Sequence, residues 1–198
     1  MSPAKTRNAP DRSDEITTLR IELKHTHPPI WRKVEVPTSI TLQQLHDIIQ
    51  IAMGWDDSHL HQFIVRGTYY GATVDDDFGL GPDMDVEEEG DVLLSQIING
   101  HRKMKFRYEY DFGDGWQHDI EVEGVVEREP RVHYPRCIEG RRACPPEDVG
   151  GPWGYAGVLA AITDPEHEDH QEMKEWVGGK FDPEKFSAEA VNRELRKL

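Results

Sequence analysis

Residues 104–126 constrain the fold most, because they predict a long β-hairpin. On both sides of a Gly-Asp-Gly turn at 113–115, aromatic and β-branched residues alternate with charged ones, which is the period of a strand with one buried face. A three-residue loop keeps every apolar residue on one face, whereas a two-residue Asp-Gly loop would mix the faces. We therefore expect the pairs Phe112 with Trp116, Tyr110 with His118, Tyr108 with Ile120, and Phe106 with Val122.

The polar face of the same hairpin carries complementary charges. The expected register places Arg107 opposite Glu121 and Lys105 opposite Glu123, and both pairs are favourable across strands. It also places His118 on the apolar face.

The segments before the hairpin predict two strands, a helix and a third strand. Alternating apolar residues predict strands over 17–26 and 30–37, and a third strand over 59–71. Between them, an apolar stripe at helical spacing predicts a helix that begins after Thr41, which forms a capping box with Gln44, and ends at Gly54. His46 and Gln50 flank that stripe.

The remaining segments differ in character. Residues 75–91 contain nine acidic residues and no basic ones, which is typical of a mobile acidic loop. After residue 130 the chain becomes rich in cysteine, proline and glycine, and two or three helical segments follow, the last capped by Ser187.

These elements predict an α+β fold: a β-grasp-like mixed sheet with one main helix, a long β-hairpin and C-terminal helices packed on it. We expect a disordered tail at 1–14 and a single domain at 15–198. Within that domain, 15–130 form the β-grasp-like core, and 131–198 form the Cys/Pro/Gly loop and the C-terminal helices.

The charge balance narrows the classes of partner. A net charge of −15 argues against direct DNA binding, which depends on clustered lysine and arginine. No stretch approaches the ~18 apolar residues of a membrane span. The N-terminus shows no signal peptide. We expect a cytoplasmic protein with reduced cysteines and a protein partner.

Four motifs carry a resemblance to a known family: LHDIIQIAMGWDDSHLHQF, YEYDFGDGWQHDIEVE, CIEGRRACPPEDVGGPWGY and FDPEKF. From about residue 16 to its end, the chain resembles the plasmid pRiA4b ORF-3-like family. The resemblance implies a passenger protein of plasmids and insertion elements, some of whose members are labelled resolvase-like. Many relatives have a third cysteine after the CPPED motif. Val149 stands there in this chain, which argues against a three-thiolate metal site.

The residues of this chain do not support the resolvase label. A serine recombinase needs a nucleophilic serine supported by several arginines, and none of the six serines lies in such a setting. The arginine and histidine constellation of a tyrosine recombinase is also missing. We therefore predict no recombinase activity.

Three histidines are the leading candidates for a site. His59 and His61 lie two apart on the expected third strand, so they should point the same way, and His118 lies on the apolar face of the hairpin. Together they predict a site for a divalent transition metal such as zinc, or an acid/base pair with Asp111 or Asp114. The plainer alternative is that each histidine is a structural residue with one satisfied hydrogen bond.

The cysteines and aromatic residues leave several readings open. Cys137 and Cys144 could be metal ligands, reactive thiols or simple packing residues, and their spacing is not that of a zinc ribbon. Trp116 and Tyr155, with other aromatic residues beside turns, could line a binding groove or pack in the core. Arginines 136, 141 and 142 could bind an anion, but we expect them to pair with Glu147 and Asp148.

Three functions remain after this reading. The first is an accessory protein of a mobile element that acts as a binding module. Its surface would join the hairpin tip, the strand of His59 and His61, and the loop at 137–155. The second is a metal-dependent hydrolase that uses His59, His61 and His118. The third is an acidic inhibitor or nucleic-acid mimic that uses the 75–91 loop.

Overall fold

The computed structural model describes residues 14–72, 86–100 and 103–198, and these residues build one eight-stranded sheet. The strands are β1 (Glu15–Leu23), β2 (Ile30–Pro37), β3 (His61–Val65), β4 (Thr68–Gly71), β5 (Val86–Glu88), β6 (Lys105–Tyr110), β7 (Trp116–Glu127) and β8 (Arg136–Arg141). Their order is β5-β4-β3-β6-β7-β1-β2-β8, and every neighbouring pair is antiparallel except β4 and β5.

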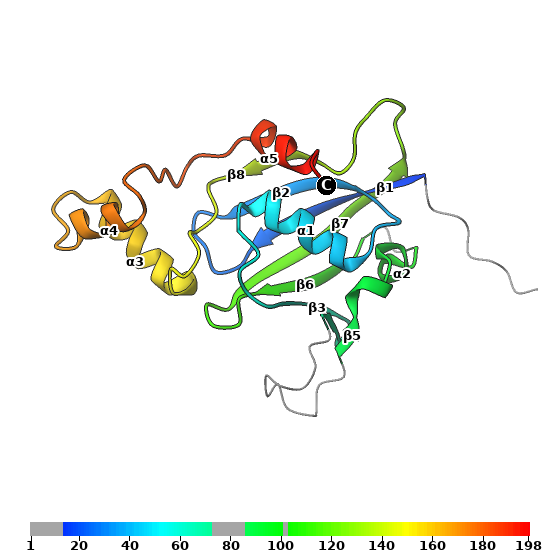
Figure 1. Ribbon diagram of the computed structural model, residues 1–198, viewed down its shortest axis with the longest axis horizontal. Coiled ribbons are helices and arrows are strands. Elements are labelled where there is room, and N and C mark those ends of the chain that lie inside the picture. Colours follow the sequence, from blue (N-terminus) through cyan, green and yellow to red (C-terminus); the bar gives the residue numbers. More distant parts are fainter. Residues whose placement is uncertain (1–13, 73–85, 101–102) are drawn as a thin grey trace, which may run out of the picture.

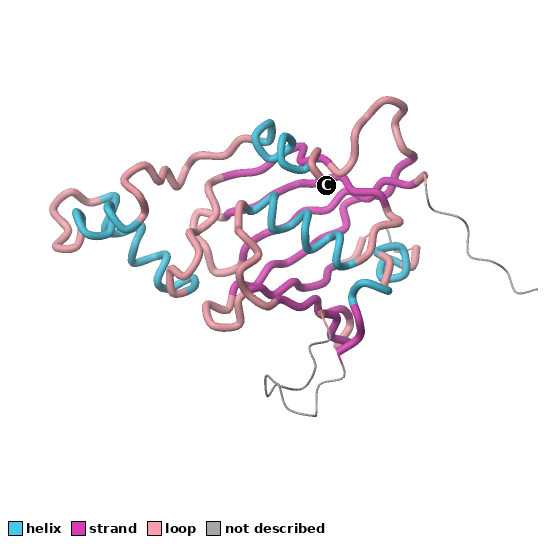
Figure 2. Tube along the Cα trace, in the orientation of Figure 1, coloured by secondary structure: helices cyan, strands magenta, loops and turns pink. Residues whose placement is uncertain are grey.

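The helices lie on one face and at one end of this sheet (Figure 1). Those in the described residues are α1 (Leu42–Met53), α2 (Leu94–Ile98), α3 (Gly151–Thr163), α4 (His170–Trp176) and α5 (Ala188–Leu195). Helix α1 crosses the sheet, α5 lies beside β8, and α3 and α4 extend beyond the end that carries the β6–β7 turn. In Figure 2, a long loop leads from α4 back to α5. Among the described residues, we find no helix with the length and hydropathy of a transmembrane span.

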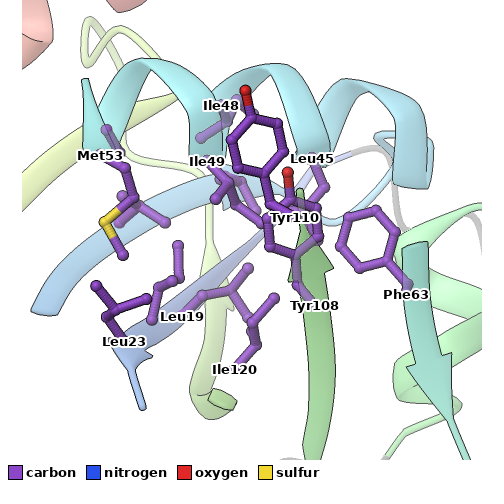
Figure 3. Close-up of a cluster of buried hydrophobic side chains, with 14 of the residues drawn as sticks. Leu19, Leu23, Leu45, Ile48, Ile49, Met53, Phe63, Tyr108, Tyr110 and Ile120 are labelled. Atoms are coloured by element: carbon purple, nitrogen blue, oxygen red, sulfur yellow. The ribbon is translucent and has the colours of Figure 1, made fainter. Parts of the chain in front are cut away.

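The core lies between α1 and the sheet. Helix α1 presents Leu45, Ile48 and Ile49 to buried residues of the central strands, such as Leu19 and Ile120 (Figure 3). The opposite face of the sheet is polar, and cross-strand ion pairs such as Lys33–Glu123 at 2.6 Å lie on it. This is the usual arrangement of an antiparallel sheet with only one covered face.

The predicted class, α+β with a mixed sheet and one main helix, is confirmed, as are the ends of α1. The Thr41–Gln44 capping box is present, and Gly54 ends the helix in the left-handed region with φ 96°. Ser187 caps α5 through its side chain, which accepts from the Ala190 N–H. The β-grasp-like part of the prediction is not confirmed.

The register of the predicted hairpin is wrong by two residues. The structure pairs Tyr110 with Trp116, Tyr108 with His118 and Phe106 with Ile120, so the loop spans five residues instead of three. A shift of two keeps the paired apolar residues of both strands on the buried face, as predicted, but Phe112 loses its predicted partner, lies in the loop and is 44% exposed. The charged partners change with it, and Lys105 contacts Glu121 at 3.0 Å.

Two predicted loops contain regular structure. The cysteine-rich segment forms the edge strand β8, which pairs with β2. In the acidic segment, residues 75–85 lie outside the described residues, but Val86–Glu88 form β5 and Glu89–Asp91 a 3₁₀ turn. The helix expected from Pro165 begins only at His170.

Candidate functional site

The β6–β7 turn presents a carboxylate whose orientation is fixed by its own backbone. Asp111 is buried and lies in the left-handed region with φ 54°. Its Oδ1 accepts hydrogen bonds from the N–H groups of Gly113 at 2.9 Å and Asp114 at 3.2 Å, and its own N–H donates to the Leu60 carbonyl. Because Oδ1 is engaged in the turn, Oδ2 is the oxygen that faces His59, at 3.7 Å from Nε2.

Hydrogen bonds hold the loop at 145–149 against the end of β6 and the segment that follows α1. Trp55 donates through Nε1 to the Pro145 carbonyl at 3.0 Å. Glu147 Oε1 accepts from the Tyr110 hydroxyl and from the Asp56 N–H, each at 3.0 Å. Burial raises the pKa of Tyr110, so its hydroxyl stays protonated and donates at neutral pH. These bonds fix the residue that follows Glu147, Asp148.

The start of α3 contacts the hairpin tip directly. The Gly150 N–H donates to Asp114 Oδ2 at 3.0 Å. Gly151 has φ +69°, and a Cβ there would lie 2.3 Å from the Asp114 carbonyl oxygen. Only glycine fits this approach without displacement.

Three segments thereby bring one imidazole and two carboxylates together. The ligand atoms of His59, Asp111 and Asp148 all lie within 4.8 Å of one another, and His59 Nε2 is 3.2 Å from Asp148 Oδ1. Nε2 is buried, yet it makes no hydrogen bond of normal geometry with the described residues. The Asp148 side chain is 75% exposed, so the group opens to solvent on one side.

A second group contains His46, Asp57 and His61, and its geometry argues against a shared metal ion. The two imidazoles are stacked, with centroids 3.4 Å apart and planes 6° from parallel. An ion between them would lie about 1.7 Å out of each ring plane, half of the 3.4 Å separation, whereas the nitrogen lone pair lies in the plane.

Hydrogen bonds account for this second group. Gln50 donates to the Tyr108 hydroxyl at 2.9 Å. Since that oxygen already accepts from Gln50, its own proton is donated to His46 Nδ1 at 2.8 Å. His46 therefore carries its proton on Nε2, which donates to Asp57 at 2.9 Å. His61 Nε2 contacts the buried Glu89 carboxylate at 2.9 Å. Burial, and then the charge of His61, lower the pKa of His46, which favours this neutral tautomer.

His61 and His118 therefore lie apart from His59. β3 begins only at His61, so the alternation expected of a strand does not extend to His59. His118 is fully buried between Trp55 and Tyr108, with ring centroids 5.3 Å from each. Burial lowers the pKa of His118 to about 3, and among the described residues His118 belongs to no group of three or more potential metal ligands.

The cysteines are not part of either group. Burial raises the pKa of the Cys137 thiol to about 11 and raises that of Cys144 as well, whereas metal binding requires the thiolate. The guanidinium of Arg32 opposes both shifts. Arg32 is itself buried and donates to the carbonyls of Ala52 and Arg141. Of the two cysteines, Cys137 is buried and Cys144 is partly buried.

Of the two readings of the aromatic residues, packing in the core holds for Trp116 and Tyr155, which are buried, whereas Trp153 is 87% exposed. The expected pairing of the basic cluster with Glu147 and Asp148 is wrong, because Arg142 pairs with Glu184 and Arg136 with Glu35.

Sequence reasoning did not place two carboxylates beside these histidines. Asp148 was considered only as an arginine partner, and the buried Glu89 only as part of an acidic loop. The signal for Asp148 was its place in the CPPED motif, between two prolines and two glycines that fix the loop.

Gly151→Ala tests the contact between the hairpin tip and α3. The added Cβ meets the Asp114 carbonyl, so we expect unfolding to require roughly 1–3 kcal/mol less free energy. Gly157→Ala in the same helix is the control, because no atom lies within 4 Å of its Cβ position. Urea unfolding measures both. Equal stability of the two variants would contradict the close contact.

His118→Phe tests the buried neutral imidazole. In the unfolded chain, histidine gains a proton below pH ~6.5, whereas folded His118 does not until about pH 3. Stability therefore falls as pH drops through this window, by up to ~1.4 kcal/mol per pH unit from this group. We expect His118→Phe to remove that part of the acid destabilisation. His133→Gln, at an exposed position, should retain it.

Comparisons with known proteins place the chain in a family. Residues 15–190 match the family model for plasmid pRiA4b ORF-3-like protein. The uncharacterized protein y4hQ of Sinorhizobium fredii (strain NBRC 101917 / NGR234) is 42% identical over 165 residues, which cover 82% of this chain and 81% of that protein. The crystal structure of MM3350 from Methanosarcina mazei Go1, a protein of unknown function, aligns with a TM-score of 0.79 and 36% identity. That alignment covers 88% of this chain and 96% of the other. The chain thus belongs to the plasmid pRiA4b ORF-3-like family.

Proposed function

We propose that this chain binds one divalent transition-metal ion through His59, Asp111 and Asp148 and uses it for hydrolysis. The observation that supports this most is the buried His59 Nε2, which faces two carboxylate oxygens at 3.2 and 3.7 Å without a normal hydrogen bond. Ligands held at ~2.1 Å from a common ion lie about 3.0–3.6 Å apart, close to these separations.

The local charge also favours a cation. Asp111 and Asp148 converge beside Asp114 and Glu147, and within the described residues no lysine or arginine forms an ion pair with any of the four. Among the described residues, His59 is the one basic group that forms an ion contact with Asp111 and Asp148. A bound divalent ion would offset the repulsion between the two carboxylates.

The donor set suits zinc or manganese. One imidazole with two carboxylates resembles the three-ligand sets of catalytic zinc sites, which keep a further position for water, and a bound ion lowers the pKa of that water toward ~7. In this chain, the turn N–H groups orient Asp111, and the exposed side of Asp148 would face the substrate.

Metal binding is tested on tag-free protein by equilibrium dialysis against Zn²⁺ and, separately, Mn²⁺, followed by elemental analysis. We expect about one equivalent for the unaltered chain and at least tenfold weaker binding for His59→Gln and Asp148→Asn. The matched control is His61→Gln, which should keep the stoichiometry because His61 belongs to the stacked pair. Loss of binding in His61→Gln alone would contradict the assignment.

Hydrolysis is measured on the same metal-loaded proteins with p-nitrophenyl acetate and p-nitrophenyl phosphate. Metal-dependent turnover of either ester that Asp148→Asn abolishes would support the hydrolytic role. If the protein binds metal but hydrolyses neither ester, the metal-binding part of the proposal stands and the hydrolytic part is contradicted for these two substrates.

We propose a second function, binding of a protein partner, because three exposed apolar side chains come from the segments that build the site. Leu60 precedes β3, Phe112 lies in the hairpin tip, and Trp153 lies in the first turn of α3. The backbone contacts of Leu60 with Asp111 and of Gly151 with Asp114 bring these segments together. Large exposed aromatic residues are typical of interaction sites.

Trp153→Ser tests the partner surface. Because Trp153 is 87% exposed, its loss should change stability by less than about 0.5 kcal/mol, yet reduce recovery of a partner in pull-downs from host lysate. Trp176→Ser, in α4, is the matched exposed control. Equal recovery by both variants would exclude Trp153 from the interface.

A further inference from the structure

A cavity of about 440 Å³ opens between the β7–β8 loop and the end of α5, two segments that lie side by side in Figure 1. This volume is within the ~300–1,000 Å³ that is typical of pockets for small organic ligands. None of the proposed metal ligands lines the cavity. The lining residues are Arg131, Val132, His133, Pro135, Arg136, Asn192 and Arg196.

Three of the lining residues are arginines, and none is acidic. Arg131 and Arg196 are exposed, and within the described residues neither forms an ion pair. Arg136 contacts Glu35 through Nε at 2.6 Å, but its side chain is 32% exposed and its two Nη groups make no hydrogen bond with the described residues. The guanidinium groups are thus open to solvent and largely unpaired. Because like charges repel, a bound anion would stabilise this arrangement.

Asn192 fixes α5 beside the start of β8. Its amide oxygen accepts from the Cys137 N–H at 2.7 Å, and its amide nitrogen donates to the Cys137 carbonyl at 2.8 Å. Arg196 follows Asn192 by four residues with helical backbone angles, so the two lie on the same face of the helix. Arg136 directly precedes Cys137. These two hydrogen bonds therefore hold Arg196 on the side of α5 that faces Arg136.

Arg131 occupies a backbone position that ordinarily favours glycine. It has φ 67°, and the Val132 N–H donates to the Glu129 carbonyl, which closes a turn with Pro130 second and Arg131 third. A positive φ at the third position is typical of a type II turn, where glycine or asparagine is preferred. An arginine with a left-handed backbone is strained, and such strain is typical of positions whose side chain is used.

The chemistry of these donors favours a small organic phosphate. A phosphomonoester presents three acceptor oxygens and up to two negative charges, which match several guanidinium groups. Inorganic phosphate alone would leave most of the cavity unfilled, including the walls formed by Val132 and Pro135. A nucleic-acid strand would extend beyond the cavity. The exposed carboxylates that flank the lining segments in sequence, Glu127, Glu129 and Glu139, would repel it.

We propose that this cavity binds a small organic phosphomonoester. The phosphate oxygens accept hydrogen bonds from the guanidinium groups of Arg131, Arg136 and Arg196, and the organic part of the ligand lies against the walls at 132–135. The site is independent of the metal site.

AMP and glucose 6-phosphate are the probes, each titrated into ¹⁵N-labelled full-length protein with EDTA present and followed by amide NMR. We expect saturable shifts centred on Arg131, His133 and Arg196 with at least one ester, at millimolar or tighter affinity. Adenosine, glucuronate and inorganic phosphate should each bind at least fivefold more weakly. They lack, respectively, the charge, the phosphate and the organic part.

Three outcomes would overturn the proposal. The first is no saturable shift with either ester. The second is binding of adenosine or glucuronate as tight as that of the corresponding ester. The third is inorganic phosphate that binds as tightly as the better ester, which would indicate a site for a bare ion only.

Arg196→Gln and Arg131→Gly are the decisive variants. Each should weaken ester binding at least fivefold. The melting temperature should stay unchanged in Arg196→Gln, which loses no ion pair, and stay unchanged or rise in Arg131→Gly, because glycine adopts the left-handed conformation without strain. Unchanged affinity in either variant would contradict the proposal.

Arg193→Gln is the matched control, because it removes the same charge from the same helix at a position that does not line the cavity. It should bind the esters within twofold of the unaltered chain. Equal weakening in Arg193→Gln and Arg196→Gln would indicate a general effect of charge and contradict the site.

His59→Gln separates this proposal from the metal site. It should retain ester binding even though metal binding is lost. Loss of ester binding in His59→Gln would place the phosphate at the metal ligands and overturn the independence of the two sites.

Discussion

The candidate site depends on one interaction, the docking of the loop at 145–151 on the hairpin tip. Glu147 is its centre, because one carboxylate oxygen accepts both the Tyr110 hydroxyl and the Asp56 N–H. The Trp55 indole and Asp114 hold the loop on either side of Glu147. These hydrogen bonds hold residues that are distant in sequence close together in space. Asp148 is thereby held beside His59 and Asp111. The site exists only when all three segments are in place.

Buried polar side chains of α1 also hold the segment that carries His59. Gln50 accepts the Asp57 N–H and donates to Tyr108, so it ties the segment that carries His59 to the helix and the sheet. His46 continues the network to Asp57. These bonds explain why polar residues flank an otherwise apolar helical stripe. Their energetic role is to fix a loop, since a satisfied buried network specifies one arrangement.

How far the sequence predicts this structure depends on the range of the interactions. The helix caps and the strand faces follow from local patterns, so α1, β1, β2 and the buried face of the hairpin could be predicted. The hairpin register could not, because the left-handed conformation of Asp111 and its side-chain turn lengthen the loop. A shift of two residues conserves the faces, so the pattern alone cannot distinguish the registers.

The candidate site was harder to predict, because its members come from three separate segments. His59 and Asp111 were identified from residue type, but no periodicity indicates that Asp148 joins them. His61 looked equivalent to His59 because the predicted strand begins at residue 59, two residues before β3 begins in the structure. His118 was considered a metal ligand because of its residue type, although its place on the apolar face of the hairpin already indicated a core residue. In the structure it is buried, and burial lowers its pKa.

The central claim is that His59, Asp111 and Asp148 share one metal ion. Anomalous diffraction from crystals soaked in Zn²⁺ tests it most directly, because the peak locates the ion without reference to activity. The account predicts one strong peak at about 2.0–2.2 Å from His59 Nε2 and from a carboxylate oxygen of each aspartate. A peak beside the His46–His61 stack instead, or no peak at His59 in well-ordered crystals, would contradict it.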